Sequence, residues 1–213
     1  MLPDKKLKQV MKYLAFLLTS VILVFIWSFI NPKGYFTWML EVFPGVIGLI
    51  ILMFTFRKFR FTNLVYTLIG VHCCILFVGG HYTYAEVPLF DWIRDTFHQS
   101  RNNYDKVGHL AQGLVPALIV REIFTRGKVI NKPGWQGLII VSICMAISVT
   151  YEFIEWFVSI ATGEAGDSFL GTQGYIWDTQ SDMLFATLGA ILSLLIFSGW
   201  HDRQLKAFKN ESV

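Results

Sequence analysis

Three short pairs of ionisable residues stand in segments that are otherwise apolar. The pairs are Asp105 with His109, Glu152 with Glu155, and Asp178 with Asp182. Residues three or four apart lie on the same face of a helix, so each pair can present its two side chains together. Carboxylates combined with a histidine suit a divalent metal ion, and a further carboxylate beside them can move a proton. Ionisable side chains inside membrane segments are costly and mark functional sites, so the surrounding segments decide how to interpret these pairs.

The composition indicates an integral membrane protein. Of the 213 residues, 54% are hydrophobic and only 15% are charged, whereas soluble domains carry roughly 25% charged residues. Six apolar stretches have the length of about 20 residues that crosses a bilayer. They cover residues 13–30, 36–56, 62–80, 105–124, 135–160 and 178–197. The expected fold class is therefore all-α, a polytopic membrane bundle of six transmembrane helices that forms one domain over residues 1–213.

The longest polar connection, residues 81–104, contains a short amphipathic segment at residues 89–97. Its apolar face comprises Leu89, Phe90, Ile93 and Phe97. Charged side chains such as Asp91 and Asp95 lie away from that face. This pattern predicts a short outer interfacial helix on the membrane surface.

The distribution of basic residues predicts the orientation in the membrane. Six spans place both termini on the same side. Only Lys33, Arg94, Arg101 and Lys106 fall on the opposite side, so the side of the termini holds the other 14 of the 18 lysines and arginines. The positive-inside rule then predicts that both termini lie in the cytoplasm. In this topology all three ionisable pairs fall near the outer ends of their spans.

The same features limit the partners. The basic residues gather in loops, as topology requires, and are not interleaved with aromatic residues on a soluble surface, so nucleic acid is not expected. Cys73, Cys74 and Cys144 lie within apolar stretches, which argues against a disulfide framework. Membrane lipids are the expected partners, and a lipid or an envelope precursor is the expected substrate if the protein is an enzyme.

Carboxylates gathered in one outer pocket require protons, basic partners or a bound cation as compensation. The basic residues predicted nearby are Lys106, His81 and His109. The candidate metal ligands are Asp105, His109, Asp178, Asp182 and His81. The candidate catalytic residues, which would move a proton, are Glu152 and Glu155. The metal itself is unknown, and Mg, Mn, Zn and Fe all fit such a ligand set.

Structural explanations for these residues stay open. Asp105 and Asp178 each begin a predicted helix, where an aspartate can serve only as the N-cap. His81 can be an ordinary loop residue at the membrane interface. Glu152 and Glu155 lie deeper in their span, where capping does not explain them.

Four motifs resemble those of the YjdF-type family of bacterial inner-membrane proteins, which has no assigned function. The motifs are Gly-Gly-His-Tyr-Thr-Tyr at 79–84, Asp-Lys-Val-Gly-His at 105–109, Tyr-Glu-Phe-Ile-Glu-Trp at 151–156 and Asp-Thr-Gln-Ser-Asp-Met at 178–183. The resemblance covers nearly the whole chain. More distantly, the Asp105 motif and the Asp182 to Gly189-Ala190 segment are similar to VanZ-like proteins, which are associated with glycopeptide resistance.

Three functions are compatible with these observations. The leading hypothesis is metal-assisted hydrolysis or transfer on a lipid or envelope precursor, with the cation held by Asp105, His109 and Asp182. The second is an ion- or proton-coupled transporter, which requires a polar route to the cytoplasmic side. The inner halves of the spans are nearly free of charge in the sequence, which disfavours a transporter. The third is a structural membrane protein whose acidic residues only cap helices and form ion pairs. The sequence leaves open whether the protein is an enzyme.

Overall fold

The computed structural model describes residues 4–163, 169 and 171–210, and within these residues all regular secondary structure is helical. The helices are α1 (Asp4–Phe29), α2 (Tyr35–Thr55), α3 (Asn63–His81), α4 (Pro88–Thr96), α5 (Tyr104–Gly127), α6 (Pro133–Thr162) and α8 (Asp178–Asn210). Six of them, all except α4, are long and apolar enough to cross a membrane. The predicted all-α bundle with six spans is therefore confirmed.

The ends of the helices differ from the predicted boundaries where the chain turns polar. α8 continues to Asn210, whereas the apolar stretch ends near Phe197. α1 begins at Asp4, well before the apolar stretch starts at Tyr13. Hydropathy marks where a segment can sit in lipid, but a helix continues into water wherever the backbone can extend its hydrogen bonds.

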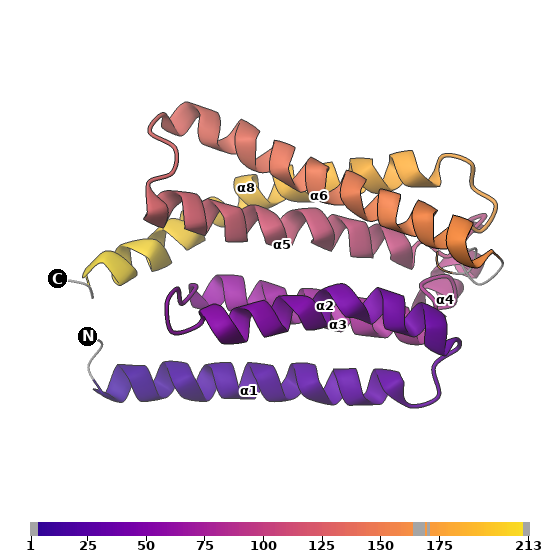
Figure 1. Cartoon of the computed structure of the whole chain (residues 1–213), viewed down its shortest axis with the longest axis horizontal. Helices are drawn as coiled ribbons and strands as arrows, with labels where there is room; N and C mark the ends of the chain where they lie inside the picture. The colour runs from indigo at the N-terminus through magenta and orange to yellow at the C-terminus, as the bar shows by residue number, and fades with distance from the viewer. Residues whose placement is uncertain (1–3, 164–168, 170, 211–213) are drawn as a thin grey trace.

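The six long helices run roughly along one direction, with both termini at the same end of the bundle (Figure 1). α4 lies at the opposite end, which we call the α4 end; it also holds the first turns of α5 and α8 and the last turn of α6 (Figure 1). α1 and α2 pack on α3, whereas α6 and α8 pack on α5. The contact between α3 and α5 joins the two halves.

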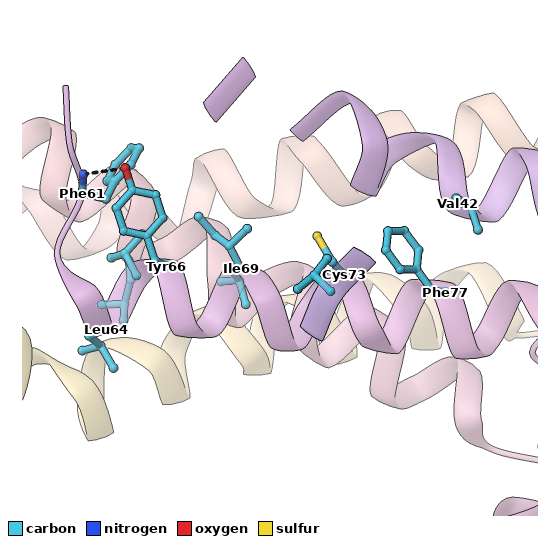
Figure 2. Close-up of a cluster of buried hydrophobic side chains, with 11 residues drawn as sticks. Val42, Phe61, Leu64, Tyr66, Ile69, Cys73 and Phe77 are labelled. Carbon is cyan, nitrogen blue, oxygen red and sulfur yellow. Dashed lines mark hydrogen bonds between the residues drawn. The ribbon is translucent and has the colours of Figure 1, made fainter. Parts of the chain in front are cut away.

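An apolar core fills the first half of the bundle and reaches α5. Ile69, Cys73 and Phe77 recur every four residues along one face of α3, and Val42 of α2 lies beside Phe77 (Figure 2). This spacing places one stripe of side chains on the same helical face. Cys73 is a free thiol that packs as a small hydrophobic residue, as expected.

The closest helix crossing joins α5 to α8 and depends on two glycines. A Cβ atom on Gly113 would lie 2.6 Å from the carbonyl carbon of Ala186, and one on Gly189 would lie 3.0 Å from the backbone nitrogen of Leu114. Since these neighbours are backbone atoms, no side chain can move aside to make room. Glycine at both positions therefore lets the two helices approach closely, as small residues do in membrane bundles.

The short helix α4 lies at residues 88–96, close to its predicted position. The ring of Phe90 faces Tyr104 at the start of α5, with 5.2 Å between the ring centroids. Leu89 and Phe97, which were grouped with Phe90 on one apolar face, are exposed on the outside of the bundle. The apolar side chains of α4 thus divide between the bundle and its surroundings, and the location of α4 on a membrane surface stays a prediction.

Candidate functional site

Lys106 is the centre of a buried ionic cluster at the α4 end. Its ammonium nitrogen lies 2.5 Å from Asp182 Oδ1, 2.6 Å from Asp178 Oδ1 and 3.2 Å from Asp105 Oδ2. The Lys106 side chain is only 9% exposed, and those of Asp178 and Asp182 are each 5% exposed. Because α5 contributes the lysine and α8 contributes two of its partners, the close crossing of these helices positions the cluster.

Arg101 supplies a second cation, which was predicted on the same side of the membrane as Lys106 but was not assigned to the cluster. Its guanidinium group donates to Asp178 and lies 3.4 Å from Asp105 Oδ2. It also donates to the backbone carbonyls of Gly171 and Thr172, at 3.3 Å each. The i, i+4 spacing from Arg101 to Asp105 was the available sequence signal. This pair was not predicted because Arg101 precedes the helix and was assigned to the polar connection at residues 81–104.

His109 joins the ionic cluster to the glutamates of α6. Its Nε2 atom lies 3.2 Å from Asp105 Oδ1 and 3.7 Å from Asp182 Oδ1. Its Nδ1 atom lies 3.1 Å from Gln112 Oε1 and 3.9 Å from Glu152 Oε1. Glu152 and Asp182 therefore approach the same imidazole ring from different helices, as a shared site requires.

Asp105, His109 and Asp182 are close enough to share one ion. One ligand atom from each of these residues lies within 4.8 Å of the other two. Two carboxylate oxygens and an imidazole nitrogen fit a divalent metal such as Mn, Fe or Zn. Lys106 donates to the same carboxylate oxygen of Asp182 that faces His109, so a bound ion and the lysine would share this ligand.

The glutamates of α6 face the interior of the bundle. Ser148, Glu152 and Glu155 are at most 7% exposed and follow one another at helical spacing. Within the described residues, the Ser148 hydroxyl and Glu152 Oε1 are buried without a hydrogen-bond partner. Buried polar atoms without partners are costly, so these two atoms are available to a bound molecule or ion.

A pocket of about 180 Å³ opens beside these residues. Its polar lining includes Glu41, Asp105, His109, Tyr151 and Glu155. Glu41 comes from α2 and is 6% exposed, and the Tyr151 hydroxyl donates to it at 3.4 Å. Glu41 was not among the candidate site residues, because it is a single acidic residue near the start of its apolar stretch.

Tyr84 forms part of the pocket wall, and its ring accounts for the presence of glycine at two neighbouring positions. Its ring packs where Cβ atoms of Gly79 and Gly108 would stand, with 2.8 Å from the position on Gly108 to Tyr84 Cε1. Burial raises the pKa of the Tyr84 phenol well above its ordinary value. The phenol therefore stays neutral and can donate a hydrogen bond into the pocket.

The remaining predicted ligands have other partners. His81 lies apart from the cluster, with Nδ1 3.0 Å from the backbone carbonyl oxygen of Ser28 and its ring against Trp27. Asp178 belongs to the cluster through Lys106 and Arg101 but not to the group of three that could share an ion. The N-cap of α5 is Asn103 rather than Asp105, so ion pairing accounts for the Asp105 carboxylate better than capping.

The opposite end of the bundle also contains buried ionisable groups, so the expectation that the inner halves are nearly free of charge is wrong there. Glu122 of α5 is fully buried and accepts from Thr62 Oγ1 at 2.9 Å, Arg126 at 2.8 Å and His201 Nε2 at 3.0 Å. Arg121 donates to His201 Nδ1, which fixes the tautomer that donates from Nε2 to Glu122. His201 lies beyond the predicted last span, which is why the sequence did not reveal this contact.

The fold and the site together define a multi-pass membrane protein of six spans with a buried, ion-paired acidic pocket at one end. The chain belongs to the family described as "Predicted membrane protein (DUF2238)", whose model matches residues 13–203. It is also similar to "Inner membrane protein YjdF" of Escherichia coli (strain K12), with 44% identity over 189 residues, which cover 89% of this chain and 90% of that relative. No solved structure matches the chain.

These comparisons confirm the resemblance to YjdF-type proteins. The more distant resemblance to VanZ-like proteins is not confirmed. The four sequence motifs contribute Gly79, Tyr84, Lys106, Glu152 and Asp182 to one end of the bundle. The first three motifs include residues that line the pocket, and the fourth contributes Asp182 to the ionic cluster beside it.

Proposed function

We propose that this protein uses the acidic pocket for metal-assisted hydrolysis or group transfer on the polar head of a membrane lipid or lipid-linked envelope precursor. The observation that carries the proposal is the convergence of Asp105, His109 and Asp182 within 4.8 Å, at the edge of a pocket among apolar helices. A cation at these ligands would polarise an oxygen of the substrate or activate a water molecule. The family relationship supports a location in the inner membrane.

Two glutamates take different roles in the proposed reaction. Glu155 lines the pocket, where a polar head would enter, and is proposed as the general base or acid. Glu152 Oε1 lies 3.9 Å from His109 Nδ1 and is proposed to orient the imidazole, as outer carboxylates orient metal-bound histidines. Lys106 competes with the cation for Asp182 and thereby limits its affinity.

Metal binding by the purified full-length protein tests this proposal directly. The protein in detergent is titrated with Mn²⁺ or Zn²⁺ by calorimetry, and D182N and H109Q are compared with the natural sequence. Each change removes one of three ligands, so the affinity should fall at least about 10-fold, the factor given by about 1.4 kcal/mol.

The matched control is D202N, which neutralises an aspartate of the same helix at the opposite end of the bundle. The Asp202 side chain is 50% exposed and pairs with Arg121. Metal affinity that is equal in D182N, D202N and the natural sequence contradicts the proposed metal site. If the site binds metal, loss of turnover in E155Q with unchanged metal affinity assigns the proton-transfer role.

A proton-coupled transporter is the second candidate, favoured by buried ionisable groups at both ends of the bundle. Glu155 lies at the α4 end, and Glu122 with His201 lies at the end of the termini. The cavity between the two ends is lined mostly by apolar side chains, however, so no polar route joins them among the described residues. Proton uptake into liposomes that depends on both Glu122 and Glu155 would favour the transporter over the enzyme.

A further inference from the structure

An apolar groove continues from the acidic pocket toward the end of the bundle that holds the termini. The groove has a volume of about 420 Å³. Pro44, His72, Leu76 and Pro116 line both the pocket and the groove, so the two cavities adjoin at these side chains. Beyond this junction the groove is lined by side chains of α2, α3 and α5, including Leu52, Ile69, Val115, Ile119 and Ile123. A polar cavity thus leads into an apolar one.

The combined length of the two cavities approaches the thickness of the hydrocarbon region. Along α5 their lining extends from Asp105 to Ile123, about 27 Å for 18 residues at 1.5 Å each. The hydrocarbon core of a bilayer is about 30 Å thick, so one leaflet contributes about 15 Å. A chain that follows the groove from a head at the α4 end must therefore pass the bilayer midplane.

The groove has room on the side between α2 and α5. α2 packs against α3 and makes little contact with α5. Gly48 of α2 lines the groove, and no atom lies within 4 Å of the position where its Cβ would stand. A hydrocarbon chain can therefore enter sideways from the membrane without displacing packed side chains.

His72 marks the boundary between the polar and the apolar cavity. It lines both, and its Nε2 atom is buried without a hydrogen-bond partner in the described part of the chain. A lipid has ester or phosphate oxygens where its head joins its hydrocarbon chain. An oxygen at this boundary would satisfy the ring nitrogen, which is otherwise costly to bury.

A second apolar groove shows that apolar lining alone does not distinguish the first. This groove, of about 380 Å³, lies among α1, α2 and α3 and is lined by residues such as Leu14, Leu18 and Leu49. Its lining shares Leu52 and Ile69 with the first groove, but contains no carboxylate or histidine and no residue of the acidic pocket. It therefore serves as an internal control for ordinary contact with membrane lipid.

We infer that the groove between α2 and α5 binds the long hydrocarbon chain of a polyprenyl lipid whose head enters the acidic pocket. The acyl chains of ordinary phospholipids extend only through their own leaflet, whereas a polyprenyl chain is long enough to pass the midplane. This inference names the substrate class and rests on the proposed function for the role of the head. Binding of the chain is nevertheless measurable without any reaction.

Photo-crosslinking tests the inference with the full-length protein in nanodiscs. The probe is a polyprenyl phosphate with a diazirine at the far end of its chain, and labelled residues are identified by mass spectrometry. Labels should concentrate at the deep end of the groove, around Ile119 and Ile123, rather than around Leu14 and Leu18. The variant G48L adds a side chain to the groove at a position where a Cβ meets no atom within 4 Å. It should reduce this labelling about 10-fold, the factor given by about 1.4 kcal/mol.

The variant G199L is the matched control, because a Cβ on Gly199 also meets no atom within 4 Å but this residue lines neither cavity. It should leave the labelling unchanged. Equal labelling of the two apolar grooves, or equal labelling of G48L and G199L, overturns the inference. So does equally strong labelling of Ile123 by a diacyl phospholipid with a terminal diazirine. Metal titration of the same samples separates this failure from failure of the proposed function, since the ligands lie outside the groove.

Discussion

The ammonium nitrogen of Lys106 lies 2.5 Å from Oδ1 of Asp182, and this ion pair joins α5 to α8 inside the bundle. The same nitrogen contacts Asp105 and Asp178, so one lysine pairs with three carboxylates. Compensation by basic residues, which the sequence left as one of three explanations, is therefore present in the cluster. A bound cation at Asp105, His109 and Asp182 is a further proposal and does not follow from these ion pairs.

Replacement of Lys106 by methionine should destabilise the protein and strengthen metal binding. The change keeps the hydrocarbon stem but leaves Asp178 and Asp182 with less positive charge, and removal of one partner from a buried ion pair costs about 3–5 kcal/mol. Thermal unfolding in detergent, followed by tryptophan fluorescence, measures the loss. The control K33M removes an exposed pair with Glu86, which should contribute at most about 1 kcal/mol. Equal stability of K106M and K33M would contradict the central role of Lys106.

Replacement of Gly189 by valine should separate α5 from α8 and disrupt the ionic cluster. A Cβ at this position would meet the backbone of Leu110 and Leu114 rather than a movable side chain. Overpacking of a core typically costs about 1–3 kcal/mol or more, and backbone contact places this variant at the upper end. The control G199V adds the same side chain to α8 in open space. Unfolding temperatures that fall equally in both variants would show that the crossing is not as close as described.

Replacement of Glu122 by alanine should destabilise the end of the bundle that holds the termini. The change leaves the buried donors of Thr62 and His201 without their acceptor and removes one partner of the half-buried Arg126, at a cost of about 3–5 kcal/mol. The thermal unfolding assay in detergent measures this loss. D202N, which affects a half-exposed pair with Arg121 on the same helices, should change stability by less than about 1 kcal/mol. A loss in D202N as large as in E122A would show that burial does not decide the difference.

Both termini should lie in the cytoplasm and the acidic pocket should open to the opposite side. Reporters active in only one compartment can be fused after Val213 and inserted at Ser100, next to α4 in the sequence. The terminal reporter should behave as cytoplasmic and the Ser100 reporter as external, because most lysines and arginines lie on the side of the termini. The reverse pattern would place the pocket in the cytoplasmic half of the membrane and remove envelope precursors on the outer surface as substrates.

Spin labels should show that α4 lies along the membrane surface with two different apolar environments. A label at Phe90 should report burial against the bundle, whereas a label at Trp92 should report contact with lipid. A label at Asp95 should report water. Accessibility to oxygen and to a water-soluble relaxation agent measures each environment. Water exposure at both Phe90 and Trp92 would exclude the interfacial arrangement.

The sequence by itself determined the class of fold and which acidic residues share a helical face. In lipid every backbone polar group must be satisfied within the segment, so six long apolar stretches can only be six helices. The spacing of Glu152 and Glu155 placed both side chains on one helical face, and the structure shows both buried. Local rules were sufficient for these features because they depend on neighbours in the chain.

The tertiary structure decided which charges meet. Lys106 reaches Asp182 across 76 residues and Glu122 reaches His201 across 79, and no periodicity in the sequence encodes either contact. Both contacts depend on the close approach of α5 and α8 at Gly113 and Gly189. This crossing sets the distance between the two helices and their register along the bundle. The sequence could show that the buried charges needed partners, because burial without them is costly, but only the packing of the helices could choose those partners.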